Sequence, residues 1–240
     1  MLKKRSNVGL NVLLKQYLWS QKKRRSQGFT LLDVIVAIVV LTSFTSVAMT
    51  AMTSAILLKV RARITSEATN WIQHDLETVR NSAAQFSYSL ASDAASGQPS
   101  ITLASNPGLT AGEQISVGTD ATIYTIQSVS GTLIRLTTNL RYSQIAGARI
   151  LALSKCNATT SQAGFAYVFG QNLPSLANGG TQTISGKNYT LTRQSAVSST
   201  APYSALKLTY TVTPQGGQTA LTTMYTEVIP NAVFQCPGAQ

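Results

Sequence analysis

The chain has 240 residues, a length that allows one or two domains and no more. It carries 19 lysines and arginines against 8 acidic residues, for a formal net charge of +11 at pH 7. Eight of the basic residues and none of the acidic ones lie in residues 1–28, so the remainder has a formal charge of only +3. A basic protein usually suggests a nucleic acid or anionic lipid as partner. Here the uneven distribution argues against that role for the body and instead indicates a membrane orientation with the positive end in the cytoplasm.

An uncharged segment of 25 residues, Val34 to Leu58, follows this basic end. As a helix that rises 1.5 Å per residue it would be about 37 Å long, enough to cross a hydrocarbon layer of about 30 Å. Asp33 stands directly before the segment. Ionisable residues at membrane depth are costly and usually functional, so this acid needs an explanation.

The helix is expected to continue well past Leu58, because no glycine or proline occurs between Phe29 and Ser96. In residues 59–89 apolar side chains recur mostly at intervals of three and four, which is typical of one buried helical face. We therefore predict one helix from about Thr30 to about Ser87. Residues 29–58 would lie in lipid or against other helices, and the amphipathic segment 59–96 would pack on a globular head.

The motif ahead of the apolar segment is more specific than a plain membrane span. Residues 22–33 read KKRRSQGFTLLD, with a glycine, Phe29-Thr30 and an acid in register before the helix. An ordinary secretory signal has its cleavage site after the apolar region, whereas the small residues here, Ser26 to Gly28, precede it. In this combination the chain resembles the N-terminus of type IV pilins and of the pseudopilins of type II secretion systems. The resemblance covers about 30 to 50 residues, and no resemblance of that strength extends beyond Ala84.

The resemblance implies that a prepilin peptidase cuts between Gly28 and Phe29, removes residues 1–28 as a leader peptide, and that Phe29 is then N-methylated. The family usually has glutamate at the fifth mature position. This chain has Asp33, which keeps the charge and loses one methylene. The implied role of the acid is to attract the N-terminal amine of a neighbouring subunit during assembly. The alternative is that Asp33 lies at the headgroup level of a plain signal anchor and merely favours a helix N-terminus.

The resemblance also implies a function without catalysis. The chain would be a single-pass protein of the bacterial inner membrane, with its N-terminus cytoplasmic and its head periplasmic, that joins a type IV pilus or pseudopilus as a minor component. Its partners would be the prepilin peptidase, other pilin or pseudopilin subunits and an inner-membrane assembly platform. Two alternatives stay open: a pseudopilin of a protein or polysaccharide secretion machine, and a single-span signal-anchor surface binding protein that does not polymerise.

Beyond Ser96, glycines and prolines punctuate short β-prone runs, so the head is expected to be β-rich. We interpret residues 97–153 as a β-rich insertion with strands at about 113–117, 122–128, 132–137 and 149–153 and a tight hairpin turn at Ser130-Gly131. The alternation of residues 123–129 is only partial, which leaves the register of that strand open.

Residues 154–240 are expected to form the C-terminal β-sheet region of the head. We predict a short strand or helix at 163–169, then antiparallel strands at 182–193, bent at Ser185-Gly186, at 205–213 and at 219–229. The predicted fold class is therefore α+β. The resemblance implies the pilin-like architecture, in which the C-terminal half of a long transmembrane helix packs on an antiparallel sheet.

The two cysteines, Cys156 and Cys236, are 80 positions apart, a spacing that fits neither a zinc motif nor a CxxC redox pair. If the body is exported, a disulfide that fixes the C-terminus is favoured. The alternative is two unpaired buried thiols.

Sequence patterns of enzymes are missing, because the chain contains no GxSxG, HExxH, P-loop or GxGxxG motif. His74 is the only histidine, and its acidic neighbours Asp75 and Glu77 are not spaced to share one helical face with it. A solvated helix face is favoured there over a metal or acid–base site. We therefore expect no enzyme activity, no cofactor and no metal.

Four basic residues near the predicted insertion form a loose set: Arg135, Arg141, Arg149 and Lys155. We interpret them as part of a solvated surface and expect no nucleic acid partner. Binding of DNA or a polysaccharide by the head is the weaker alternative.

Overall fold

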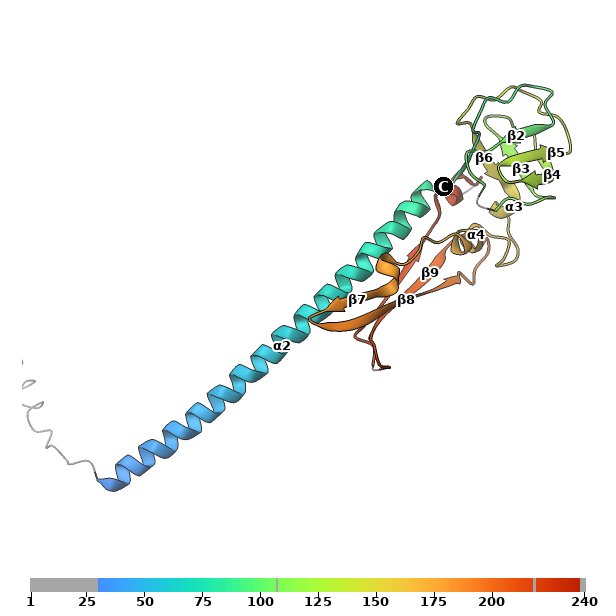
Figure 1. Cartoon of the computed structure of the whole chain (residues 1–240). Helices are drawn as coiled ribbons and strands as arrows, with labels where there is room; N and C mark the ends of the chain where they lie inside the picture. Colours follow the sequence, from blue (N-terminus) through green and yellow to red (C-terminus); the bar gives the residue numbers. More distant parts are fainter. Residues whose placement is uncertain (1–29, 107, 218, 238–240) are drawn as a thin grey trace, which may run out of the picture. The chain divides into compact units, whose positions relative to one another are not determined.

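The structure, a computed structural model, describes residues 30–106, 108–217 and 219–237. The fold is α+β, with a long helix followed by two antiparallel sheets and several short helical turns (Figure 1). By its internal contacts the chain divides into two units, Met1–Val60 and Arg61–Gln240. The predicted leader, residues 1–28, lies outside the described residues.

The long helix α2 (Leu31–Gln85) has 55 residues, so the prediction of one helix from about Thr30 to about Ser87 is confirmed. Its residues up to Val60 belong to the first unit, and every one of them is exposed. No glycine or proline interrupts the helix, which is why it continues past the apolar segment.

The later turns of α2 belong to the second unit and supply one wall of its core. The predicted apolar face is confirmed from Ala68 onward, and Ile64 is partly buried against it. The buried apolar side chains of this face are Ala68, Trp71, Ile72, Leu76, Val79 and Ala83. The amphipathic half of the helix is therefore packed on the head, as the spacing predicts.

The predicted β-rich insertion is a sheet of six strands in the order β1-β6-β3-β4-β5-β2, with every neighbouring pair antiparallel. The strands are β1 (Tyr88–Ser89), β2 (Ser100–Thr102), β3 (Gln114–Val117), β4 (Tyr124–Ser130), β5 (Leu133–Leu136) and β6 (Arg149–Ala152). The four strands predicted in this region are found. The strands β1 and β2 were not predicted, because two or three residues are too few to show an alternating pattern. The strand β1 comes from within residues 59–96, which were assigned to the helix segment.

The six-stranded sheet closes on itself where its two outer strands meet. Leu90 and Leu103, which follow β1 and β2, form an antiparallel bridge. The backbone N–H of Ala91 donates to Thr102 O at 2.8 Å, and that of Ala104 donates to Ser89 O at 2.9 Å. A closed barrel leaves no open sheet edge and turns alternate side chains inward. Its interior is filled by buried side chains that include Tyr88, Ile101, Ile115, Val117, Tyr124, Ile126, Ile134 and Ile150.

The strand β4 differs from the prediction in its turn and contains an irregular register. The hairpin turn is one residue later than predicted: Ser130 pairs with Leu133, so the loop residues are Gly131 and Thr132. The register also shifts between Ile126 and Ser128, which marks a β-bulge. Because a bulge adds one residue to one strand, it interrupts the inward and outward alternation and accounts for the partial pattern in the sequence.

The second sheet has four antiparallel strands in the order β10-β9-β8-β7. They are β7 (Thr181–Ile184), β8 (Lys187–Val197), β9 (Leu206–Pro214) and β10 (Thr222–Val228). The prediction of one bent strand over 182–193 is wrong. Ser185 and Gly186 both have positive φ, 49° and 78°, and form a two-residue turn that folds the segment into the hairpin β7–β8.

Short helical segments connect and close the head. They are α3 (Leu153–Cys156), α4 (Phe165–Gln171), η1 (Ala177–Gly180) and η2 (Asn231–Gln235). The segment 163–169, predicted as a strand or a helix, is helical from Phe165. Phe86 contacts Phe169 edge to face at 5.4 Å between ring centroids and Tyr88 at 6.0 Å. These contacts join the end of α2, the barrel and α4 in one core.

Candidate functional site

The first turn of α2 is capped by Thr30 and Asp33. Thr30 Oγ1 donates to Asp33 Oδ2 at 2.8 Å, and the Thr30 backbone N–H donates to the same oxygen at 3.2 Å. In return, the Asp33 N–H donates to Thr30 Oγ1 at 3.3 Å. This reciprocal pattern is a capping box, in which an acidic residue three positions after a threonine satisfies free donors at the helix start. The carboxylate of Asp33 therefore has a local partner within its own chain.

The apolar segment that follows presents large side chains to the surroundings. Leu31 is 81% exposed, Phe44 70% and Leu58 65%. This helix is long and apolar enough to cross a membrane. It is the one such helix among the described residues, so a single span is supported by length and composition.

Hydroxyl side chains within the apolar segment fold back on the helix. Thr42 Oγ1 donates to Ile38 O at 2.9 Å, and Ser43 Oγ donates to Val39 O at 2.7 Å. Thr45, Thr50, Thr53 and Ser54 make the same kind of bond to a carbonyl four residues earlier. A polar group in hydrocarbon is costly unless it is hydrogen-bonded, so these bonds make the segment compatible with lipid or with neighbouring helices.

The predicted cleavage and methylation site, Gly28 and Phe29, lies outside the described residues. Asp33 is described and lies in the first turn of α2. The three residues are close together in the sequence.

A buried ion pair joins the second half of α2 to the four-stranded sheet. Asp75 Oδ2 accepts a hydrogen bond from Arg193 Nη1 on β8 at 2.7 Å, and the two side chains are only 1% and 8% exposed. Asp75 Oδ1 accepts the backbone N–H of Ala177 at 3.0 Å, and Arg193 Nη2 donates to the carbonyl of Pro174. The expectation of a solvated face for His74 and its acidic neighbours is thus wrong for Asp75, which lies one turn after Trp71 on the buried face.

Tyr210 lies beside this ion pair in the core and is 0% exposed. Burial raises the pKa of its phenol, and the negative charge of Asp75 raises it further. The tyrosine therefore stays neutral and brings no further charge to the pair. In such surroundings each charge depends on the other for its stabilisation.

Cys156 and Cys236 form a disulfide with their Cα atoms 5.5 Å apart. The favoured expectation is confirmed, and the alternative of two free thiols is wrong. The bridge ties α3 to the residue that follows η2, so it fixes the last described part of the chain to the head.

The loose basic set does not form one patch. Lys155 is 3% exposed and donates to Glu113 Oε1 at 2.8 Å, so including it in a solvated surface was wrong. Arg149 lies on β6 and Arg135 on β5, with β3 and β4 between them in the sheet. Only Arg141 stands in a loop, where its guanidinium carbon lies 5.4 Å from the ring centroid of Tyr142.

His74 is exposed on α2, and among the described residues no group of three or more His, Cys, Asp or Glu side chains could hold a metal ion.

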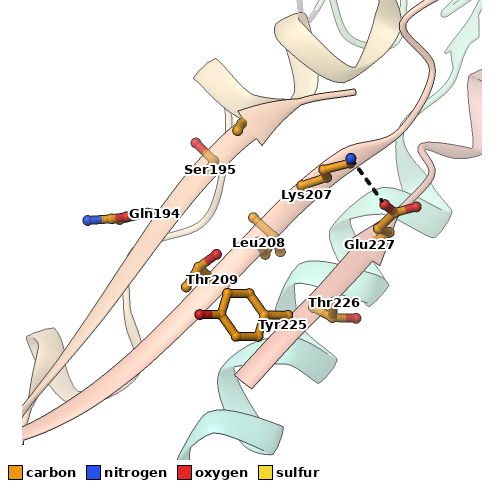
Figure 2. A pocket seen from close by; sticks show the side chains of 9 residues that line it. Gln194, Ser195, Lys207, Leu208, Thr209, Tyr225, Thr226 and Glu227 are labelled. Carbon is orange, nitrogen blue, oxygen red and sulfur yellow. Dashed lines mark ion pairs between the residues drawn. The ribbon is translucent and has the colours of Figure 1, made fainter. Parts of the chain in front are cut away.

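The outer face of the four-stranded sheet carries a shallow hollow of about 430 Å³ (Figure 2). Gln194, Thr209 and Tyr225 lie in one register row across β8, β9 and β10. Two positions further along these strands Lys207 pairs with Glu227, with 3.8 Å between the charged atoms. Tyr225 is 77% exposed. Apart from the ion pair, the side chains that line the hollow are uncharged.

Comparisons with known protein families, with curated proteins and with solved structures returned no match for this chain.

Two features of the site, the capping box and the buried acid on α2, have signals in the sequence that were not used in the predictions above. Thr30 and Asp33 have the spacing of a capping box directly before an apolar run. Asp75 falls between Trp71 and Val79 at intervals of four, in the middle of the apolar face. An acid at such a position predicts a buried partner, because a charge in a core is costly when it is unpaired.

Proposed function

We propose that the chain is a membrane-anchored, prepilin-like subunit that assembles through its N-terminal helix into a type IV pilus or pseudopilus, as a minor component. A prepilin peptidase would cut after Gly28 and leave Phe29 as the methylated N-terminus. The observation that carries the proposal is a carboxylate held at the first turn of α2, directly ahead of 25 uncharged residues whose side chains are all exposed. A helix with such a surface needs lipid or other helices around it.

The basic leader supports the orientation in this proposal. Residues 1–28 carry eight basic residues and no acid, which keeps them in the cytoplasm while the apolar segment spans the inner membrane. Removal of the leader would take away most of the positive charge and create a new cationic amine four residues before Asp33.

The capping box sharpens the role proposed for Asp33. Among the residues that the structure describes, Thr30 donates to this carboxylate, and both of its bonds go to Oδ2. A carboxylate offers about four acceptor positions, so it can keep this cap and still accept the charged amine of a neighbouring subunit. Asp33 can therefore cap the helix and dock a neighbouring subunit at the same time. The two roles have different requirements, because capping needs an acceptor atom and docking needs the negative charge.

We expect Asp33→Asn to separate the two roles. Asparagine keeps an oxygen that can accept from Thr30, so the helix start is retained, but it has no charge for an amine. A hydrogen bond between charged groups contributes about 1.5–3 kcal/mol, so incorporation into sheared filaments should fall by about tenfold or more. Cleavage of the leader should be unchanged, as judged by the size of the protein in membranes.

Thr30→Ala is the matched control, because it removes the threonine cap and leaves the carboxylate in place. It should be incorporated close to the wild-type level, and Asp33→Glu should also be tolerated. Normal incorporation of Asp33→Asn together with poor incorporation of Thr30→Ala would show that Asp33 serves only the helix start. A deletion strain then distinguishes the machines: loss of pili identifies a pilin, and loss of an exported protein or polysaccharide identifies a pseudopilin.

A further inference from the structure

A second site lies on the barrel, far along the chain from the helix start. An open hollow of about 730 Å³ lies between two loops, residues 119–122 and 141–144. This volume is within the range of small-molecule sites, about 300–1,000 Å³. The side chains that matter for its chemistry are Thr119, Asp120, Thr122, Arg141, Tyr142 and Gln144. The assembly function proposed above makes no use of them.

The two loops are joined through a buried tyrosine. Asp120 is 8% exposed, and its Oδ2 accepts the hydroxyl of Tyr124 at 2.6 Å while Oδ1 accepts the N–H of Thr122 at 2.9 Å. The Tyr124 oxygen in turn accepts the backbone N–H of Arg141 at 2.9 Å. Burial alone would raise the pKa of the Asp120 carboxyl, but these hydrogen bonds and the charge of Arg141 hold it below its usual range. The carboxylate therefore stays ionised and occupied as the link between the loops.

The second loop is also held from its other side. Ser96 donates through its backbone N–H to Ser143 Oγ at 3.0 Å and through its hydroxyl to Arg141 O at 2.8 Å. Gly118 has a φ of +62°, and a Cβ at that position would lie 1.8 Å from Gln144 Oε1. Only a glycine therefore allows this placement of the Gln144 amide. The backbone of this loop is therefore held in place before a ligand binds, which lowers the entropic cost of binding.

The mouth of the hollow offers one cation and one aromatic ring. Arg141 is exposed and forms no direct ion pair among the described residues, while the nearby Asp120 is already hydrogen-bonded. The guanidinium lies 5.4 Å from the ring centroid of Tyr142, which is 54% exposed. A guanidinium matches the two oxygens of a carboxylate, and an exposed aromatic ring packs against the apolar face of a flat ligand.

We propose that this hollow binds a carboxylated sugar of an acidic polysaccharide, with the carboxylate on Arg141 and the sugar ring against Tyr142. Thr119, Thr122 and Gln144 supply the mixed donors and acceptors that sugar hydroxyls require. A nucleic acid fits less well, because its phosphate chain is held by several cations along a track. Here Lys155 is paired with Glu113 in the interior, which leaves a single arginine at the hollow.

The test is calorimetric titration of the full-length protein in detergent with trigalacturonate and with its neutral methyl ester. The wild type should bind the acid at least about tenfold more tightly than the ester, as expected for one charge-assisted bidentate contact. Arg141→Gln should remove that difference, and Tyr142→Ala should weaken both ligands. The arginine side chain is exposed and its backbone groups hold the loop, while Asp120 keeps its hydrogen bonds to Thr122 and Tyr124, so the unfolding midpoint of Arg141→Gln should stay close to that of the wild type.

Two matched controls come from the same head. Arg135→Gln removes an exposed arginine from β5, and Tyr225→Ala removes the exposed ring of the other hollow; both should leave binding unchanged. Equal affinity of the wild type for the acid and its ester, or no binding of either, would overturn the proposal. So would a loss of binding in Tyr225→Ala with none in Arg141→Gln, or salt-sensitive binding of single-stranded DNA in place of the sugar. None of these outcomes bears on leader cleavage or assembly.

Discussion

Asp75→Asn should destabilise the head by about 3–5 kcal/mol, the usual cost of removing one partner from a buried ion pair. The substitution keeps the size of the side chain and an oxygen that can still accept from Ala177, so only the charge is lost. Arg193 would then keep a full charge with 8% exposure, with its hydrogen bond to the carbonyl of Pro174 retained and its carboxylate partner lost. The cost of removing that guanidinium from water, which the carboxylate offsets in the wild type, would then lower the free energy of unfolding.

The measurement is urea unfolding in detergent, followed by the fluorescence of Trp71. This residue is 4% exposed and donates through its indole N–H to Ala177 O, so it reports on the same contact. A Trp19→Phe background makes it the sole tryptophan. The matched control is Glu67→Gln, which breaks the exposed pair with Arg63 on the same helix and should cost about 0.5 kcal/mol or less. If the two variants unfold alike, the buried pair does not stabilise the packing of α2 on the sheet.

Loss of the disulfide should cost a similar amount, about 4 kcal/mol in the chain-entropy model for a closed loop of this length. Cys156 and Cys236 are separated by 80 positions, so the bond removes much of the freedom of the unfolded chain. The segment that it holds, η2 and the residue after it, also contributes the buried side chain of Ala232. We therefore expect this end of the head to be released first in the reduced protein.

If the disulfide stabilises the head, three forms of the protein that lack it should have the same urea unfolding midpoint. The wild type with reductant, Cys156→Ser and the double serine variant should share one lowered unfolding midpoint in urea, and reductant should have no effect on either variant. An unchanged midpoint after complete reduction of the wild type would contradict the expected contribution.

The sequence predicted those parts of the fold that depend on local pattern. The uninterrupted helix followed from the lack of glycine and proline, and its buried face followed from the three- and four-residue spacing around Trp71 and Val79. The strands with clear alternation, such as β9, were found within about a residue, as expected where one face is buried. The disulfide between Cys156 and Cys236 was favoured because an exported head would lie in an oxidising compartment.

The remaining features depend on contacts between distant residues. Closure of the barrel rests on the bridge between Leu90 and Leu103, which join two strands too short to show any period. The segment 182–193 was predicted as one bent strand, and the structure has a hairpin at Ser185-Gly186 instead. A serine is an uncommon residue at a positive φ, so its presence gives little indication of such a turn. The hollow at Arg141 could not be predicted either, since its loops are held by contacts between residues far apart in the sequence, such as the hydrogen bond from the Arg141 N–H to Tyr124 and the bridge between Ala94 and Gln144.

The measurement that tests the proposed function most directly is the mass of the mature N-terminal peptide from the native membrane. We expect a chain that begins at N-methyl-Phe29, and we expect Gly28→Ala to remain in the membrane at full length with residues 1–28 attached. Gly28 and Phe29 are the only residues altered or modified in this comparison. An intact disulfide in both proteins would show that the head is folded in each. A wild-type chain that begins at any other residue, or that keeps its first 28 residues, would contradict the assignment to the prepilin-like class.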